Sequence, residues 1–171
     1  MGGTSLTAVI RRLRPADIPP VSEIFGWYAQ HTVVTFEESP RPGQEWAELS
    51  VLLADLGLPF LVAELDGSVA GYAYAGPWRR KPAYRHTVED SVFVAPALTG
   101  RGIGRQLLSE LLAACGTAGV RQMIAVIADT GDPASIGLHS AFGFTAAGRL
   151  KAVGYKHGRW VDTVLMQRPV R

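Results

Sequence analysis

The chain has 171 residues, of which 47% are hydrophobic and 19% charged, and its formal net charge is +2. This composition excludes a disordered chain, and the length suits one domain, expected over residues 8–169 after a flexible segment, residues 1–7. The 17 basic and 15 acidic residues are scattered, so no basic stripe indicates a nucleic-acid partner. No apolar run is long enough to span a bilayer and no secretory pattern opens the chain, so we expect no membrane partner and a cytoplasmic location.

The first third of the chain predicts one strand and two helices. Residues 8–14 alternate in polarity as a short strand does. Pro15 and Asp17 then open a helix that should run to about His31, with the Asp17 carboxylate available to cap its free amides. A second helix is expected to end at Gly57, because apolar residues recur before it at spacings of three and four: Trp46, Leu49, Leu52, Leu53 and Leu56.

The rest of the chain predicts an α+β protein. Two apolar runs, 59–65 and 69–76, flank an Asp-Gly step, which is typical of a hairpin. A strand at 87–94 leads through a glycine loop into a helix with leucines at helical spacing. The remaining expected elements are strand 121–128, helix 132–142 and two strands around the turn 155–160. The predicted architecture is a mixed, mostly antiparallel sheet of about six or seven strands, flanked by about four helices.

The segment from Leu98 to Arg105, LTGRGIGR, lies between a predicted strand and a predicted long helix. Backbone amides in such a loop can point at an anion, and the helix dipole adds attraction, so the segment is a candidate phosphate cradle. It lacks the Gly-Lys-Ser/Thr of a Walker loop, and its G-x-G-x-G spacing departs from the dinucleotide fingerprint G-x-G-x-x-G. An ordinary tight turn that enters a helix is the alternative interpretation.

The same loop resembles the Q/R-x-x-G-x-G/A loop that binds the CoA pyrophosphate in the GNAT family of N-acetyltransferases. Thr99, Gly102 and Gly104 stand at its three positions, and Thr99 departs from the usual Gln or Arg. A closer resemblance, to the phosphinothricin acetyltransferase branch, extends from about Ile10 to Gln167. It is carried by the stretches FLVAELDG, GYAYAGPW, AYRHTVEDSVFV, GRGIG, AVIAD, LHSAFGF and GYKHGRWVDTVLMQ.

The resemblance implies the GNAT fold, a homodimer, and acetyl-CoA as cosubstrate with no metal. It implies that the pyrophosphate lies on the glycine loop, at Gly100, Arg101, Gly102, Ile103, Gly104 and Arg105. It also implies that the pantetheine arm pairs as an added strand with the backbone of Val92, Phe93 and Val94. Asp132 stands where the family often has an asparagine near the cofactor, and with Pro133 it also makes a good helix cap.

Acetyl transfer from a thioester needs a neutral amine, so a positioned carboxylate must accept a proton from an alkylammonium substrate, directly or through water. Glu89 matches the proposed catalytic carboxylate of the family, and strand alternation sets it on the face opposite Asp90. His139 stands where many members of the wider family have a tyrosine that protonates the departing CoA thiolate. Histidine titrates near neutrality, which suits an acid or a proton relay. The alternatives are a salt bridge for Glu89 and a structural role for His139.

Segment 78–85 sets four cations beside two aromatic rings, a composition that suits an acidic small molecule. The resemblance matches Phe36, Arg79, Lys81 and Tyr84 to the acceptor pocket of the branch. We therefore expect N-acetylation of an amino-acid-like amine such as phosphinothricin, methionine sulfone or methionine sulfoximine. The alternatives are a protein N-terminus, a lysine or a polyamine as acceptor, and a CoA-binding module without catalysis. The four histidines show no spacing typical of a metal site.

Overall fold

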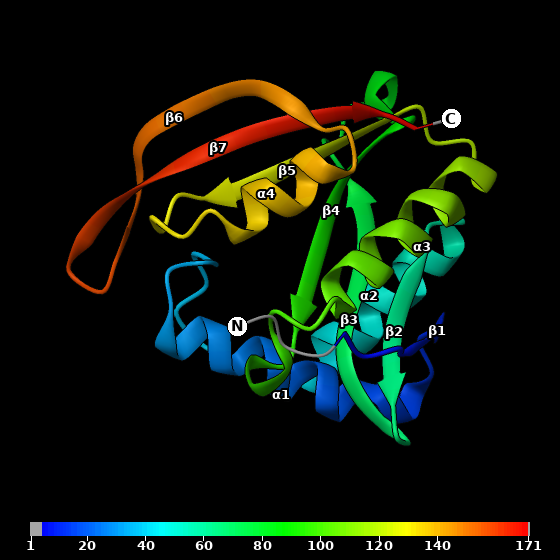
Figure 1. Ribbon diagram of the computed structural model, residues 1–171. Helices are drawn as coiled ribbons and strands as arrows, with labels where there is room; N and C mark the ends of the chain where they lie inside the picture. Colours follow the sequence, from blue (N-terminus) through cyan, green and yellow to red (C-terminus); the bar gives the residue numbers. More distant parts are fainter. Residues whose placement is uncertain (1–4, 171) are drawn as a thin grey trace.

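The computed structural model describes residues 5–170, in which a seven-stranded sheet is flanked by four α-helices (Figure 1). The strand order is β1-β2-β3-β4-β5-β7-β6, and every neighbouring pair is antiparallel except β4 with β5. The predicted mixed, mostly antiparallel architecture is therefore confirmed. The strands are β1 (Val9–Arg12), β2 (Phe60–Leu65), β3 (Ser68–Pro77), β4 (Thr87–Val94), β5 (Gln122–Ala128), β6 (Thr145–Lys156) and β7 (Arg159–Pro169). The helices are α1 (Ile18–His31), α2 (Gly43–Asp55), α3 (Ile103–Thr117) and α4 (Ala134–Ala141).

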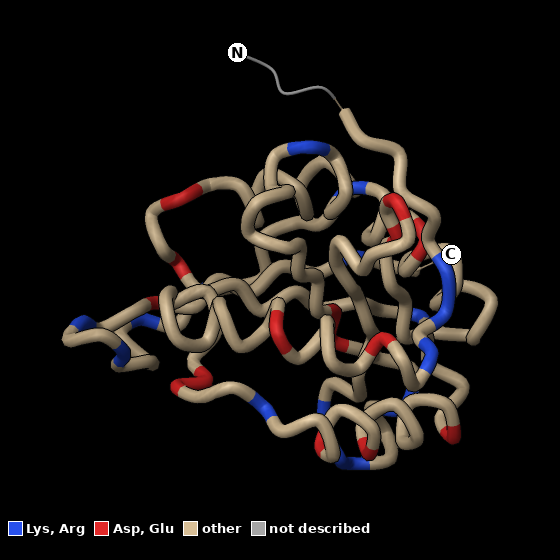
Figure 2. The backbone as a smooth tube through the Cα atoms, turned by 90° about the horizontal axis from the view of Figure 1, so that it is seen from below, with Lys and Arg blue, Asp and Glu red and all other residues tan. Residues whose placement is uncertain are grey.

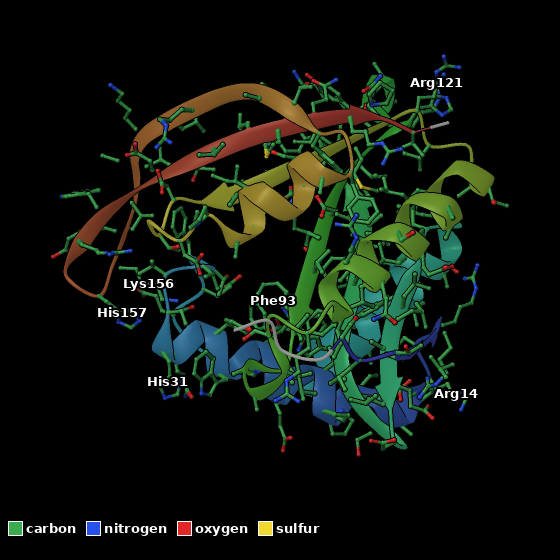
Figure 3. The ribbon with its side chains drawn as sticks, viewed as in Figure 1. Arg14, His31, Phe93, Arg121, Lys156 and His157 are labelled. Atoms are coloured by element: carbon green, nitrogen blue, oxygen red, sulfur yellow. The ribbon has the colours of Figure 1, made fainter. Side chains whose placement is uncertain are left out.

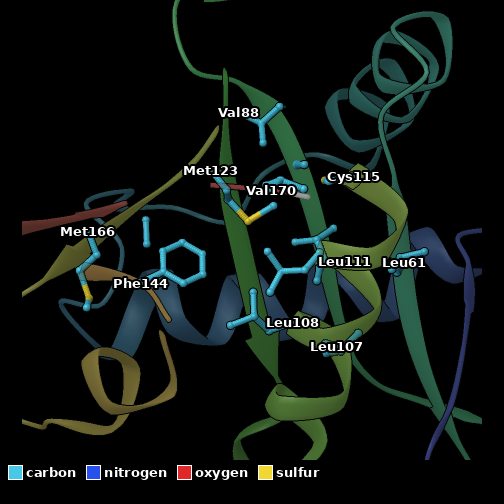
Figure 4. Packing of buried hydrophobic residues seen from close by; sticks show 14 of the residues in the cluster. Leu61, Val88, Leu107, Leu108, Leu111, Cys115, Met123, Phe144, Met166 and Val170 are labelled. Carbon is cyan, nitrogen blue, oxygen red and sulfur yellow. The ribbon is translucent and has the colours of Figure 1, made fainter. Parts of the chain in front are cut away.

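The sheet separates two hydrophobic cores, because side chains alternate between its two faces. On one face α1 and α2 pack over β2, β3 and β4, around the fully buried Trp46 and Tyr72. On the other face α3 covers the same strands, and Met123 and Phe144 extend this core toward α4 (Figure 4). The buried stripe of α3 has the helical spacing read from the sequence: Ile103, Leu107, Leu108, Leu111, Leu112 and Cys115.

Strands β4 and β5 stay together over only three residue pairs, from Thr87 opposite Gln122 to Glu89 opposite Ile124. Parallel strands need a crossover connection, and α3 supplies it. Past Glu89 the two strands diverge, with β4 still paired to β3 as far as Val94 and β5 paired to β7 (Figure 1). Glu89 therefore stands at the fork where the sheet opens.

The expected cap of α1 by Asp17 is wrong, because the Asp17 carboxylate binds other groups. The Asp17 side chain makes no capping hydrogen bond to α1. Its carboxylate accepts two hydrogen bonds from the Arg11 guanidinium, at 2.7 and 2.9 Å, and one from the Arg14 N–H at 2.7 Å. The hydrogen bonds from Arg11 hold the pKa of Asp17 below its usual range. The carboxylate therefore ties the end of β1 to the turn before α1.

Charges of both signs are spread along the backbone of the molecule (Figure 2). The apolar residues at helical spacing in α2 and at its C-cap are not all buried: Leu52 and Leu56 are half-exposed, whereas Trp46 and Leu53 are buried. Across residues 5–170, no helix combines the length and the apolar character that crossing a membrane requires.

Candidate active site

The glycine loop joins a short 3-10 turn, Pro96–Leu98, to the first turn of α3. Gly100 and Gly102 have φ angles of +73° and +85°, in the left-handed region that favours glycine. Gly102 is the N-cap of α3, and no described side chain caps the helix there. The first amides of α3 therefore lie uncapped at the positive end of the helix dipole, an arrangement that binds anions.

The glycine loop is braced by the segment that precedes β1. The N–H of Leu6 donates to the Arg101 carbonyl at 3.0 Å. The Gln106 side chain donates to the Leu6 carbonyl at 2.7 Å and accepts from the Ala8 N–H at 3.0 Å. Leu6 is thus bound, in contrast to the flexible segment expected at residues 1–7, of which residues 1–4 lie outside the described part of the chain.

Backbone groups of β4 face the fork. The N–H of Ala95 donates to the Ala70 carbonyl next to β3, so alternation turns the N–H and C=O groups of Val92 and Val94 to the opposite side. There β5 has already diverged. The Tyr28 hydroxyl donates to the Val94 carbonyl at 2.7 Å, a contact the sequence did not indicate. The other groups of Val92 and Val94 are placed to pair with an extended amide chain. The same alternation turns the N–H and C=O groups of Phe93 toward β3, so the expected pairing of Phe93 with the pantetheine arm is not open.

Glu89 is half-buried on the face of the sheet that carries α1 and α2. It shares this face with Phe93 (Figure 3), whose ring packs beside Tyr28 of α1. Burial raises the pKa of Glu89, the charge of Asp90 raises it further, and the charge of Arg79 lowers it in part. Within residues 5–170 Glu89 forms no ion pair. A carboxyl with its pKa moved toward neutrality and no ionic partner is suited to act as a general base.

Asp90 lies on the opposite face and contacts His139 of α4. The Nε2 atom of His139 is 2.8 Å from Asp90 Oδ2, and its Nδ1 atom is 2.7 Å from the Ser135 carbonyl oxygen. Both side chains are buried. The sequence suggested His139 as a proton donor to the CoA thiolate, but in the structure both of its ring nitrogens are bound inside the protein.

The predicted cap at Asp132 is present at the start of α4, and a residue that follows α4 contacts Arg105 of the glycine loop. The Asp132 carboxylate accepts from the N–H of Ala134, the first residue of α4, at 2.9 Å. The exposed Arg105 guanidinium lies 5.2 Å from the ring centroid of Phe142, which follows the helix. The end of α4 is thereby held next to the start of α3, whereas the hydrogen bond to Asp132 is local to the start of α4.

Lys156, which the sequence did not single out, holds the segment between α1 and α2. Its buried Nζ donates to the carbonyls of Thr35 and Glu37, at 2.8 and 2.5 Å (Figure 3). Burial lowers the pKa of Lys156, and nearby acidic side chains offset this in part. Phe36, between the two carbonyls, lies against Gly154, where a Cβ would overlap its ring. No local pattern could have signalled this contact, because it joins parts of the chain far apart in sequence.

The four predicted acceptor residues occupy two separate places. Arg79, Lys81 and Tyr84 are exposed on the connection between β3 and β4, which lies at the top of Figure 1. Phe36 lies on the segment between α1 and α2, at the lower left of that view. The Arg79 guanidinium stacks over Trp78, 4.2 Å from the ring centroid. The fold of one chain therefore does not gather these four side chains into one pocket.

A forked sheet, a glycine loop at the uncapped start of a helix, and a half-buried carboxylate at the fork are together suited to an acyl-transfer enzyme. Residues 21–144 match the model of the Acetyltransferase (GNAT) family, and the chain belongs to that family. It is therefore an N-acetyltransferase, and the family resemblance found in the sequence is confirmed.

Among its relatives, the chain is 48% identical to a phosphinothricin N-acetyltransferase of Alcaligenes faecalis, over 94% of this chain and 82% of the relative. It is 39% identical to an L-methionine sulfoximine/L-methionine sulfone acetyltransferase of Salmonella typhimurium, over 92% of both chains. The crystal structure of a phosphinothricin acetyltransferase from Sinorhizobium meliloti in complex with AcCoA matches with a TM-score of 0.92 at 45% identity. That match covers 96% of this chain and 89% of the other.

Proposed function

We propose that this enzyme transfers the acetyl group of acetyl-CoA to the primary amine of an amino-acid-like small molecule. Phosphinothricin, methionine sulfone and methionine sulfoximine define the type. The observation that carries the proposal is the half-buried Glu89 at the fork, beside free backbone groups of β4. Glu89 is also close enough to Arg79 for the charge of Arg79 to lower its pKa in part. The names of the relatives add support, since they specify these same compounds.

The residues at the fork fit the chemical needs of acetyl-CoA. The glycine loop and the uncapped start of α3, together Gly100 to Arg105, would hold the pyrophosphate, and the backbone of Val92 and Val94 would pair with the pantetheine arm. Bound acetyl-CoA supplies an activated thioester. The contact expected at Asp132 would add to this site, although its carboxylate already serves the start of α4.

In the proposed direct transfer, Glu89 accepts one proton from the ammonium group of the acceptor, directly or through water. The neutral nitrogen then attacks the thioester carbonyl carbon, the N–C bond forms and the C–S bond breaks. The nitrogen loses a second proton, and the CoA sulfur leaves with one, so the products are the amide and CoA with its thiol. We propose that Arg79, with Lys81 and Tyr84 on the same connection as further contacts, binds the acidic group of the acceptor. Phe36 lies in a separate place in one chain and is not part of this contact.

The proposal is tested by measuring thiol release from acetyl-CoA with separate acceptors: phosphinothricin, methionine sulfone, methionine sulfoximine, spermidine and a peptide with a free N-terminus. We expect turnover with the first three, and little with spermidine, because its cations would meet the basic connection between β3 and β4. Turnover confined to spermidine or the peptide would favour the alternative acceptors. Acetyl-CoA binding without turnover on any acceptor would indicate a non-catalytic module.

Replacing Gly102 by alanine is expected to weaken acetyl-CoA binding about tenfold. A left-handed conformation costs a residue with a Cβ roughly 1–2 kcal/mol, and binding would have to restore it. The new Cβ would also lie 3.1 Å from Ser5 Oγ. Isothermal titration with acetyl-CoA measures the effect. Gly119→Ala is the matched control, since Gly119 has a φ of +78° and open space around it at the other end of α3. An equal loss of affinity in both variants would count against the cradle.

We also propose that the protein forms a homodimer. The β6–β7 hairpin projects from the molecule in Figure 1. It carries large apolar side chains that are 48–67% exposed, as is typical of a surface covered by another copy: Leu150, Val153, Tyr155 and Trp160. Sedimentation equilibrium is expected to give twice the monomer mass at micromolar concentration, and a monomer there would contradict the proposal.

A further inference from the structure

The contact between Asp90 and His139 joins two elements that meet at the fork. Asp90 lies one residue beyond the last β4–β5 pair, and His139 reaches it from α4, 49 residues later in the chain. Glu89 precedes Asp90 in the sequence, and although the two side chains lie on opposite faces of β4, the charge of Asp90 raises the pKa of Glu89. Burial of Asp90 and His139 removes the screening that water would give.

The hydrogen bonds fix how many protons the two side chains hold. The Ser135 carbonyl can only accept, so His139 Nδ1 carries a proton. A second proton must lie between Nε2 and Asp90 Oδ2, 2.8 Å apart. Whichever atom holds it, the two side chains together carry no net charge. Burial alone lowers the pKa of His139, but the hydrogen bond and charge of Asp90, with the Ser135 carbonyl, raise it above its usual value, which favours imidazolium with carboxylate.

Groups on two other elements lie near Asp90, while Glu89, its neighbour on β4, points to the opposite face of the sheet. His139 comes from α4. The Cys115 thiol of α3 has its pKa raised to about 12 by burial and by the charge of Asp90, so it stays neutral and cannot compensate that charge. The second oxygen, Asp90 Oδ1, is buried and has no hydrogen-bond partner among the described residues. His139 is therefore the cation that balances Asp90.

We propose that His139 is a positioning residue: it neutralises Asp90, fastens α4 to β4, and so keeps Glu89 in the ionised form that accepts a proton. It does not deliver a proton to the CoA thiolate. This inference rests on the proposed role of Glu89 as the base. Without His139, a buried carboxylate with no balancing charge would stand beside Glu89 and oppose its ionisation.

Two single variants test the inference by moving the charge in opposite directions. His139→Gln keeps an amide that can donate to Asp90 but removes the positive charge. Asp90→Asn removes the negative charge and leaves His139. We expect the acidic limb of the kcat/KM profile to move up by about one pH unit in H139Q, a loss of about tenfold below the limb, and to move down in D90N. The double variant D90N/H139Q is expected to return near the parent limb.

The same shifts should appear without any acceptor. Titration of the Glu89 carboxyl by carbon-13 NMR, assigned by its loss in E89Q, is expected to show a higher pKa in H139Q and a lower one in D90N. Thermal melting and acetyl-CoA binding establish that each variant is folded. If H139Q does not fold, D90N alone gives the direction in which the pKa of Glu89 moves.

An unchanged Glu89 titration in the folded variants would overturn the inference. So would a loss of kcat in H139Q that D90N does not relieve, since that outcome indicates an acid for the thiolate. A parent enzyme without turnover would defeat the proposed function while leaving the NMR test intact.

Discussion

Glu89→Gln is expected to lower kcat by about 10²–10⁴-fold and to leave acetyl-CoA binding unchanged, because the amide keeps the shape of the side chain but cannot accept the proton of the ammonium group. Pre-steady-state and steady-state thiol release at saturating acetyl-CoA measure the loss, and calorimetry measures binding. Glu110→Gln, at an exposed position of α3, is the matched control and should retain full turnover. Turnover of E89Q at the parent rate would contradict the role of Glu89.

Glu89→Gln is also expected to change how kcat/KM depends on pH. Glu89 acts as a base only when ionised, and burial with the charge of Asp90 raises its pKa, so kcat/KM should rise as pH rises through that raised pKa. The rise should be absent in E89Q. A raised pKa in the folded state also means that stability is lost as pH rises through it, so E89Q should be no less stable than the parent at neutral pH. A lower melting temperature for E89Q would indicate that the variant is inactive because it unfolds.

Gly71→Ala is expected to reduce the free energy of unfolding by roughly 1–3 kcal/mol through overpacking. A Cβ at this position of β3 would lie 2.8 Å from the Phe93 carbonyl oxygen, and 3.2 Å from both Val94 Cα and Leu107 Cδ1. Two of these atoms belong to the backbone of β4 and the third to buried α3, so none can move cheaply. Displacement of β4 should also weaken acetyl-CoA binding, because Val92 and Val94 would no longer line the fork in register.

Urea unfolding of G71A and of the matched control Gly148→Ala measures this effect. Gly148 is also a strand glycine, but a Cβ there would meet no atom within 4 Å. G148A should therefore unfold at nearly the parent midpoint. Equal midpoints for G71A and G148A would show that β4 tolerates the extra methyl group, and the tight approach between β3 and β4 would then have no energetic consequence.

Much of the secondary structure, and which side chains it buries, could be predicted from local patterns, because such patterns depend on residues only a few positions apart. The period of two placed Glu89 and Asp90 on opposite faces of β4, and the structure confirms it. Helical spacing indicated the buried face of α3, and the glycine pattern indicated the loop before it, where Gly100 and Gly102 need the left-handed conformation. The family followed from motifs that extend along nearly the whole chain.

Contacts between distant segments could only come from the tertiary structure, since no local period records which surfaces meet. The burial of His139 against Asp90, the hold of Lys156 on the segment that carries Phe36, and the bond from Leu6 to the glycine loop are of this kind. Asp17 looked like a helix cap because its neighbours permit one, but β1 brings the Arg11 guanidinium within reach, and a charged donor binds a carboxylate more strongly than a free amide does. Local sequence patterns were sufficient to predict the secondary structure elements, their buried faces and the chemical groups available. Which of those groups are free to react, and which are held inside, depends on how distant segments pack.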